Sequence, residues 1–95
     1  MAETIEHRFP GHGAREIYDR LVAQLGAVAS EYGLKLDTDE AGLKGRVHRK
    51  GMVDVHFAAL EERLAADVDF GMLIPRSIRE KVRSELEKRL GGLFS

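Results

Sequence analysis

Apolar and polar residues alternate along four consecutive segments between residues 34 and 70. The alternation predicts strands at 34–37, 43–48, 53–59 and 64–70, joined by short turns. Alternation with a period of two is typical of antiparallel strands that have one face in the core and one in water. Because the connections are short, we expect a four-strand meander. The residues expected on its buried face are Leu34, Leu36, Leu43, Gly45, Val47, Val53, Val55, Phe57, Ala59, Leu64, Ala66, Val68 and Phe70.

The turns of the meander follow from matching buried faces, since a slip of one residue would turn a whole strand over. We expect the first loop at Asp39–Gly42 and the second at Arg49–Gly51, with Gly51 in a left-handed conformation. The tip of the third turn falls at Glu61 and Glu62. These turns predict three pairs of facing residues: Leu36 with Gly45, Val47 with Val53, and Val55 with Val68.

A further strand and a long helix precede the meander. The stretch from Thr4 to Phe9 predicts a strand, for which the sequence leaves the pairing partner open. Apolar residues at helical spacing predict a helix from about Gly13 to Tyr32. Gly33 supplies the left-handed residue that ends many helices. The start of the helix has only glycine or histidine available as a cap, which is a weak choice.

A second helix follows the meander and ends at Gly91-Gly92. It begins at Pro75, which suits a first helical position, or at Ser77, which opens a sequence of the capping-box type. After the helix, Leu93 or Phe94 is expected to fold back on its last turn. Four apolar residues form a stripe along it: Ile78, Val82, Leu86 and Leu90.

These elements predict a single α+β domain over residues 1–95. Its two layers are an antiparallel four-strand meander plus the N-terminal strand, and two helices packed on one face, in the order β-α-β-β-β-β-α. We expect both helices on the same face because the apolar side of the sheet is too wide for one helix to cover.

The composition narrows the classes of function. The chain has no cysteine, which excludes disulfides and thiolate zinc sites. No apolar run approaches the roughly 20 residues of a membrane helix, and the first residues do not resemble a secretory signal, so a cytoplasmic location is expected. Basic residues are interleaved with acidic ones and the net charge is −1, which does not favour nucleic-acid binding.

The outer face of the sheet is expected to carry a polar cluster of Lys44, Asp54, His56 and Asp67. A carboxylate beside His56 suggests a general base or a metal anchor. The alternative is a charge-balanced surface in contact with water, which the common occurrence of exposed ion pairs favours. No nucleophile motif lies in the sequence, and the histidine spacings match no metal-ligand pattern. No catalytic residue, cofactor or metal is therefore expected.

Three stretches carry a family resemblance: IEHRFPGHGAR from Ile5 to Arg15, Tyr32-Gly33-Leu34, and VDFGMLIPRSI from Val68 to Ile78. In these the chain resembles the polyhydroxyalkanoic acid system proteins, small bacterial proteins encoded near genes for polyester-granule synthesis. The resemblance implies no defined reaction and no catalytic residues. It implies a role at polyhydroxyalkanoate granules, with the granule or its enzymes as partner.

Two functions follow as expectations. The first is a non-enzymatic accessory or interaction protein of polyhydroxyalkanoate granule metabolism, which self-associates, for example as a homodimer. The alternative is a small α+β module that binds an apolar ligand in a cavity between sheet and helices, where Gly45 leaves room on the inner face. An enzyme acting through His56 and Asp67 is a third, less favoured interpretation, since neither a pocket nor a nucleophile accompanies them.

Overall fold

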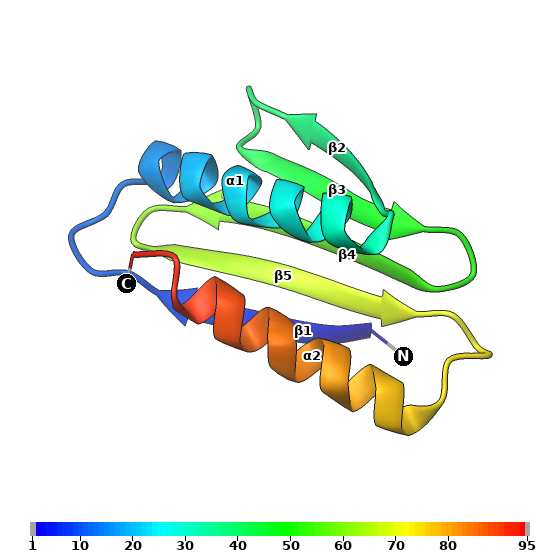
Figure 1. The fold of residues 1–95 in the computed structure, drawn as a ribbon. Coiled ribbons are helices and arrows are strands. Elements are labelled where there is room, and N and C mark those ends of the chain that lie inside the picture. The colour runs from blue at the N-terminus through cyan, green and yellow to red at the C-terminus, as the bar shows by residue number, and fades with distance from the viewer. Residues whose placement is uncertain (1, 95) are drawn as a thin grey trace.

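The chain follows the element order that the alternation predicts (Figure 1). The structure is a computed structural model and describes residues 2–94. Its elements are β1 (Ala2–Arg8), α1 (Ala14–Tyr32), β2 (Lys35–Asp39), β3 (Lys44–Arg49), β4 (Val53–Leu60), β5 (Arg63–Phe70) and α2 (Arg76–Gly91).

The strands form one antiparallel sheet in the order β1-β5-β4-β3-β2. The partner of the first strand, which the sequence leaves open, is β5, where Ile5 lies opposite Ala66. Strands β1 and β2 are therefore the two edges, and α1 connects one edge to the other across the sheet (Figure 1). The meander is confirmed, and β1 extends it on the β5 side.

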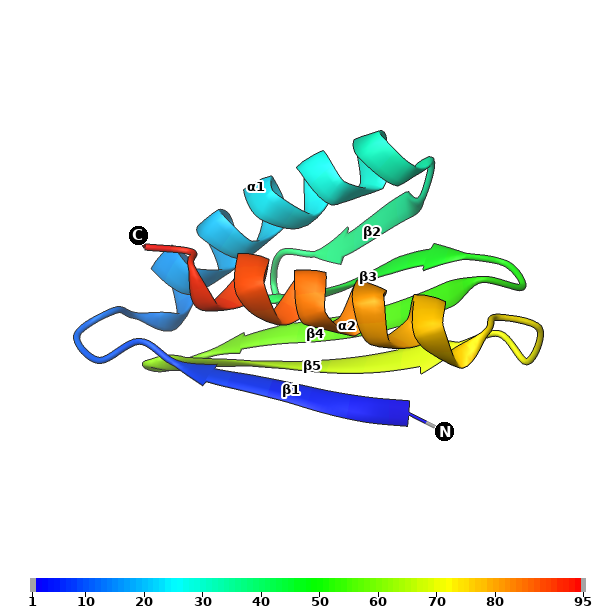
Figure 2. The ribbon, with the colours of Figure 1, turned by 60° about the horizontal axis from the view of Figure 1, so that its bottom comes forward.

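Both helices cover the same face of the sheet, as predicted (Figure 2). The inward-facing residues of the strands and one stripe of each helix form a single core, in which Val47 and Leu90 are fully buried. The predicted inner face is thus confirmed, and most charged residues of the strands lie on the opposite side; Glu3 is an exception, since its carboxylate lies 3.2 Å from Nε of Arg83 on α2. The buried residues of this core cluster other than alanine are Ile5, Phe9, Ile17, Tyr18, Leu21, Leu25, Val47, Val55, Phe57, Leu64, Val68, Leu86, Leu90 and Leu93.

Two of the three predicted registers are wrong by two residues. Leu36 lies opposite Val47, not Gly45. Val47 in turn lies opposite Val55, not Val53. The third prediction, Val55 opposite Val68, is confirmed. A shift of two residues keeps every side chain on its predicted face, so the inner and outer surfaces are unchanged.

The packing of Gly45 against Phe57 explains the observed register of β3 with β4. The two residues face each other, and a Cβ atom placed on Gly45 would lie 2.4 Å from Cζ of Phe57. The missing side chain thus makes room for the aromatic ring. The β3–β4 loop shifts accordingly to residues 50–52, with Gly51 at the predicted left-handed φ of 80°. The β2–β3 loop lies at residues 40–43, with Leu43 at φ 53°.

Helix α1 is capped by an adjacent residue at its C-terminus and by a residue distant in sequence at its N-terminus. Gly33 ends the helix with φ 66°, as predicted, and its backbone N–H donates to the carbonyl of Ala29. At the start, Gly13 has no side chain to cap with, and Glu61 from the β4–β5 turn accepts a hydrogen bond from the backbone N–H of Ala14 at 3.1 Å. The weak local cap is therefore replaced by a carboxylate from a distant turn, which the positive end of the helix dipole favours.

The second helix begins directly after Pro75, and Ser77 lies inside its first turn. No side chain caps it, so the capping-box interpretation of Ser77 is wrong. The predicted fold-back after the helix is confirmed. Leu93 is buried, and the ring of Phe94 stacks on His12 with 3.8 Å between ring centroids. Phe94 thereby packs against the β1–α1 connection.

Two glycine-to-alanine substitutions should change stability in opposite directions. Gly45→Ala forces a Cβ against Phe57 and should lower the free energy of unfolding by about 1–3 kcal/mol. Gly26→Ala should raise it by about 1 kcal/mol, because it improves helix propensity and the new methyl meets only Leu36 Cδ2 at 3.8 Å. Urea unfolding of both variants measures this. Equal stability of Gly45→Ala and wild type would contradict the role given to this glycine.

Candidate functional site

The outer face of the sheet brings together only part of the predicted cluster. His56 on β4 lies between Arg46 on β3 and Asp67 on β5. Lys44 precedes Arg46 by two residues on β3 and lies opposite Ala58. The predicted row with Lys44 beside His56 is therefore wrong, for the same reason as the register: Gly45 must face Phe57. Arg46 takes the place expected of Lys44.

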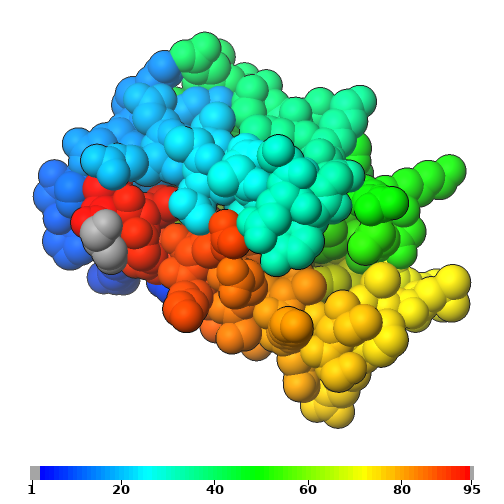
Figure 3. Space-filling view, in the orientation of Figure 1, coloured from blue at the N-terminus to red at the C-terminus, as the bar shows by residue number. Residues whose placement is uncertain are grey.

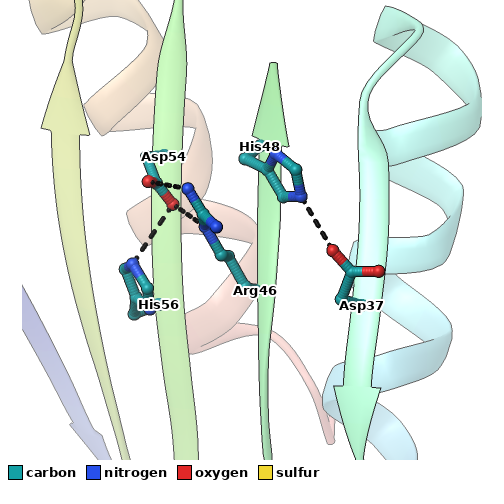
Figure 4. Close-up of polar contacts among 5 residues, drawn as sticks. All are labelled: Asp37, Arg46, His48, Asp54 and His56. Atoms are coloured by element: carbon teal, nitrogen blue, oxygen red, sulfur yellow. Dashed lines mark hydrogen bonds and ion pairs between the residues drawn. The ribbon is translucent and has the colours of Figure 1, made fainter. Parts of the chain in front are cut away.

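Asp54 is the centre of the polar contacts around His56 (Figure 4). Arg46 donates two hydrogen bonds to its carboxylate, from Nε at 2.7 Å and from Nη2 at 2.5 Å. The Nε2 atom of His56 lies 3.3 Å from Asp54 Oδ1. One carboxylate thus contacts both a guanidinium and an imidazole on neighbouring positions of the sheet.

Three other polar residues of this face, His48, Asp37 and Asp67, have partners outside the group around Asp54. His48 Nε2 lies 2.8 Å from Asp37 Oδ2 across β2 and β3 (Figure 4). Asp67, expected to orient His56, instead accepts a hydrogen bond from the Thr4 hydroxyl at 2.8 Å. The sequence reasoning placed neither Asp37 with His48 nor Arg46 with His56. The size match of Gly45 with Phe57 would have given the second pair, since it fixes the register of β3 with β4, but not the first, which depends on the register of β2 with β3.

The electrostatics of this face favour charge balance over catalysis. Hydrogen bonds from Arg46 lower the pKa of Asp54, and a hydrogen bond from His48 lowers the pKa of Asp37. Both carboxylates are therefore weak bases. The His56 side chain is 61% exposed, and residues 2–94 contain no group of three His, Asp or Glu side chains placed to hold a metal ion. The arrangement is that of a solvated surface.

The inner side of the molecule holds an apolar groove of about 450 Å3, within the range of small-ligand sites. Its floor is the inner face of the sheet, and its walls are the C-terminal half of α1 and the part of α2 from Ile78 to Arg89. Figure 3 shows a hollow between these two helix segments. The groove is lined by Leu25, Val28, Tyr32, Leu34, Val47, Met52, Val53, Val55, Phe70, Ile74, Ile78, Lys81, Val82, Glu85, Leu86 and Arg89.

The groove exists because the two helices diverge toward the start of α2 (Figure 2). Leu86 and Leu90, in the second half of α2, are buried, whereas Val82 is half-buried and Ile78 is 49% exposed. The predicted stripe of α2 thus faces the core only over its second half. Its first half forms a wall of the groove.

An ion pair joins the two helices beside the groove. Arg89 of α2 donates from Nη2 to the carboxylate of Glu31 on α1 at 3.0 Å. Through Nε it also donates to Glu85, one turn earlier on its own helix, at 2.9 Å. These contacts raise the pKa of Arg89. Two carboxylates therefore hold this guanidinium in place at the side of the groove.

Exposed apolar side chains surround the open end of the groove. We call this set, Tyr32, Met52, Met72, Leu73 and Ile78, the apolar rim. Met72 and Leu73 are 102% and 93% exposed. They lie in the loop 71–75, which is anchored by a hydrogen bond of 2.9 Å from the N–H of Gly71 to the carbonyl of Met52. Clustered exposed apolar residues of this kind are typical of interaction surfaces.

Comparisons of the chain with protein-family models, with curated proteins and with solved structures find no significant match. Neither α1 nor α2 has the length and apolar content needed to cross a membrane.

Replacement of Asp54 by asparagine should weaken the fold in a pH-dependent way. The folded-state pKa of Asp54 is lowered, so its contacts with Arg46 stabilise the fold above the ordinary carboxyl pKa of about 4 and are lost as the pH falls through the lower folded value. We expect Asp54→Asn to be slightly less stable than wild type at neutral pH and equal to it in acid. Urea unfolding at both pH values measures the difference.

Asp69→Asn is the matched control, because Asp69 lies directly opposite Asp54 on the next strand. Its substitution removes a like charge and should leave neutral-pH stability unchanged or slightly higher. If Asp54→Asn shows no loss at neutral pH, the Arg46–Asp54 contact contributes nothing to folding.

Proposed function

We propose that this protein is a non-enzymatic binding protein that takes up an apolar group in the groove between α1 and α2. The observation that carries the proposal is the groove itself, about 450 Å3 in volume and lined mainly by aliphatic and aromatic side chains. Apolar lining with a few polar groups is typical of ligand pockets. Val53, Phe70 and Val82 are only half-buried in the free protein, so an apolar occupant would complete the core at this end.

The distribution of charge supports binding over catalysis. None of the four histidines lines the groove: His48 and His56 lie on the outer face, His12 lies at the β1–α1 connection, and His7 on β1 packs beside Gly91 at the far end of α2. The groove on the opposite face is lined by three charged residues, two of which, Glu85 and Arg89, pair with each other. A site that lacks an acid–base pair beside its pocket favours retention of a ligand over its conversion.

Filling the groove should abolish binding of a neutral apolar probe. Val82→Trp places an indole between the helices, and we expect it to remove the fluorescence increase of N-phenylnaphthylamine that wild type produces. Leu60→Trp is the matched control, because Leu60 is an exposed apolar residue outside the groove. Fluorescence titration with both variants, each checked for cooperative unfolding, makes the comparison. Equal probe binding by Val82→Trp and wild type would place the apolar site elsewhere.

We also propose that the protein acts as an accessory protein at polyhydroxyalkanoate granules, in line with the resemblance of its VDFGMLIPRSI segment to the polyhydroxyalkanoic acid system proteins. A polyester surface is apolar, and the apolar rim presents Met72 and Leu73 to it without any change in the fold. A cytoplasmic location goes with this role. Self-association of the protein through the same rim is a second use of that surface.

Polar substitution of the rim should release the protein from granules. Met72→Ser combined with Leu73→Ser removes two side chains that are almost fully exposed, so the fold should keep its stability. We expect wild type to co-sediment with isolated polyhydroxyalkanoate granules and the double variant to remain in the supernatant. Leu60→Trp serves again as a variant outside the rim. Absence of wild-type protein from the granule pellet would overturn the granule role without affecting the groove.

A further inference from the structure

We propose that the ligand of the groove is a free single-chain carboxylate of the fatty-acid type, with its alkyl chain between the helices and its carboxylate at Lys81. The inference rests on the proposed apolar-binding function and adds the chemical class of the ligand and the residue that recognises its head group. It follows from the pairing of charges on α2 and from the position of Lys81 in the groove wall.

The acidic residues of α2 are all engaged by arginines. Helix α2 carries six basic residues and three glutamates. Each glutamate contacts an arginine one turn away: Glu80 with Arg76 at 3.1 Å, Glu85 with Arg89 at 2.9 Å, and Glu87 with Arg83 at 3.5 Å. The helix therefore neutralises its acids with arginine, and three basic residues, Arg79, Lys81 and Lys88, make no ion pair within residues 2–94.

Lys81 is the one lysine in the lining of the groove. Within residues 2–94 it makes no ion pair, although Glu85 lies one turn farther along the helix, because Glu85 is already bound to Arg89. Arg89 is in turn held by Glu85 and by Glu31. The charged lining thus consists of the Glu85–Arg89 pair and the ammonium group of Lys81, which is the one cation of the lining without a carboxylate partner within residues 2–94.

This charge selects the class of ligand. Lys81 follows Ile78 by one helical turn and precedes Val82, and it lines the groove while the residue as a whole is exposed. A lysine at such an edge packs its aliphatic stem on apolar surface and keeps its ammonium group in water. A single ammonium group matches a singly charged carboxylate. A phosphate dianion would keep one charge uncompensated beside apolar side chains, which is costly. A ligand with a long aliphatic tail and one carboxylate therefore matches both the apolar lining of the groove and the ammonium group of Lys81.

Titration with a pair of matched ligands tests the inference. Laurate and dodecanol share the same alkyl chain and differ in the charge of the head group. We expect wild type to bind laurate about tenfold more tightly than dodecanol, the usual gain of a charge-assisted hydrogen bond. Lys81→Gln should lose this preference and bind both ligands equally. Isothermal titration calorimetry at neutral pH, below the micelle concentration of laurate, gives the affinities.

Lys88→Gln is the matched control, since it removes the same charge from the same helix outside the groove. It should keep the wild-type preference for laurate. Equal affinity of wild type for laurate and dodecanol, or equal losses in both lysine variants, overturns the carboxylate inference and leaves apolar binding in place. Laurate binding that survives Val82→Trp also overturns it, because the ligand then lies elsewhere. If wild type binds neither ligand and no neutral probe, the proposed function itself fails.

Discussion

The width of the sheet's apolar face is the constraint on which the rest of this structure depends. Five strands present more apolar surface than one helix can cover, so the chain places a helix at each side of the same face. The helices meet where Leu90 and Leu93 are buried and diverge toward Ile78. Closure at one end is reinforced by Phe94, whose ring packs between Phe9 and His12. The open end is the groove, which is thus a direct result of covering a wide sheet with two helices that are closed together at only one end.

The two faces of the sheet have different physical roles. On the outer face, carboxylates are matched by arginine and histidine, as in the contacts of Asp54 with Arg46 and of Asp37 with His48. Such balanced, exposed charges make the uncovered face hydrophilic and discourage its association with the sheets of other molecules. The inner face supplies the apolar free energy of folding, and the part that the helices do not cover remains available for a ligand. The same apolar inner face therefore contributes to both folding and ligand binding, and a bound ligand stabilises the folded state by mass action.

The sequence predicts which side of each strand faces the core, because alternation has a period of two and tolerates a register error of two residues. The alternation alone does not distinguish between registers that differ by two residues. The choice depends on volume, namely Gly45 opposite Phe57, and the wrong choice places Lys44 instead of Arg46 beside the histidine of the outer face. The groove is less accessible to prediction. Its wall includes Ile78, which the helical stripe assigns to the core. The exposure of Ile78 depends on the angle between the two helices, which no local sequence pattern encodes.

The cap on α1 has a consequence for how the chain matures during synthesis. Gly13 offers no side chain, and the carboxylate that bonds to the N–H of Ala14 belongs to Glu61, in the turn between β4 and β5. The neighbouring Glu62 exchanges backbone hydrogen bonds with Phe9 and His12 in the same corner. A ribosome releases the helical segment well before it has made that turn. The first turn of α1 therefore gains its carboxylate cap only after the β4–β5 turn has been translated.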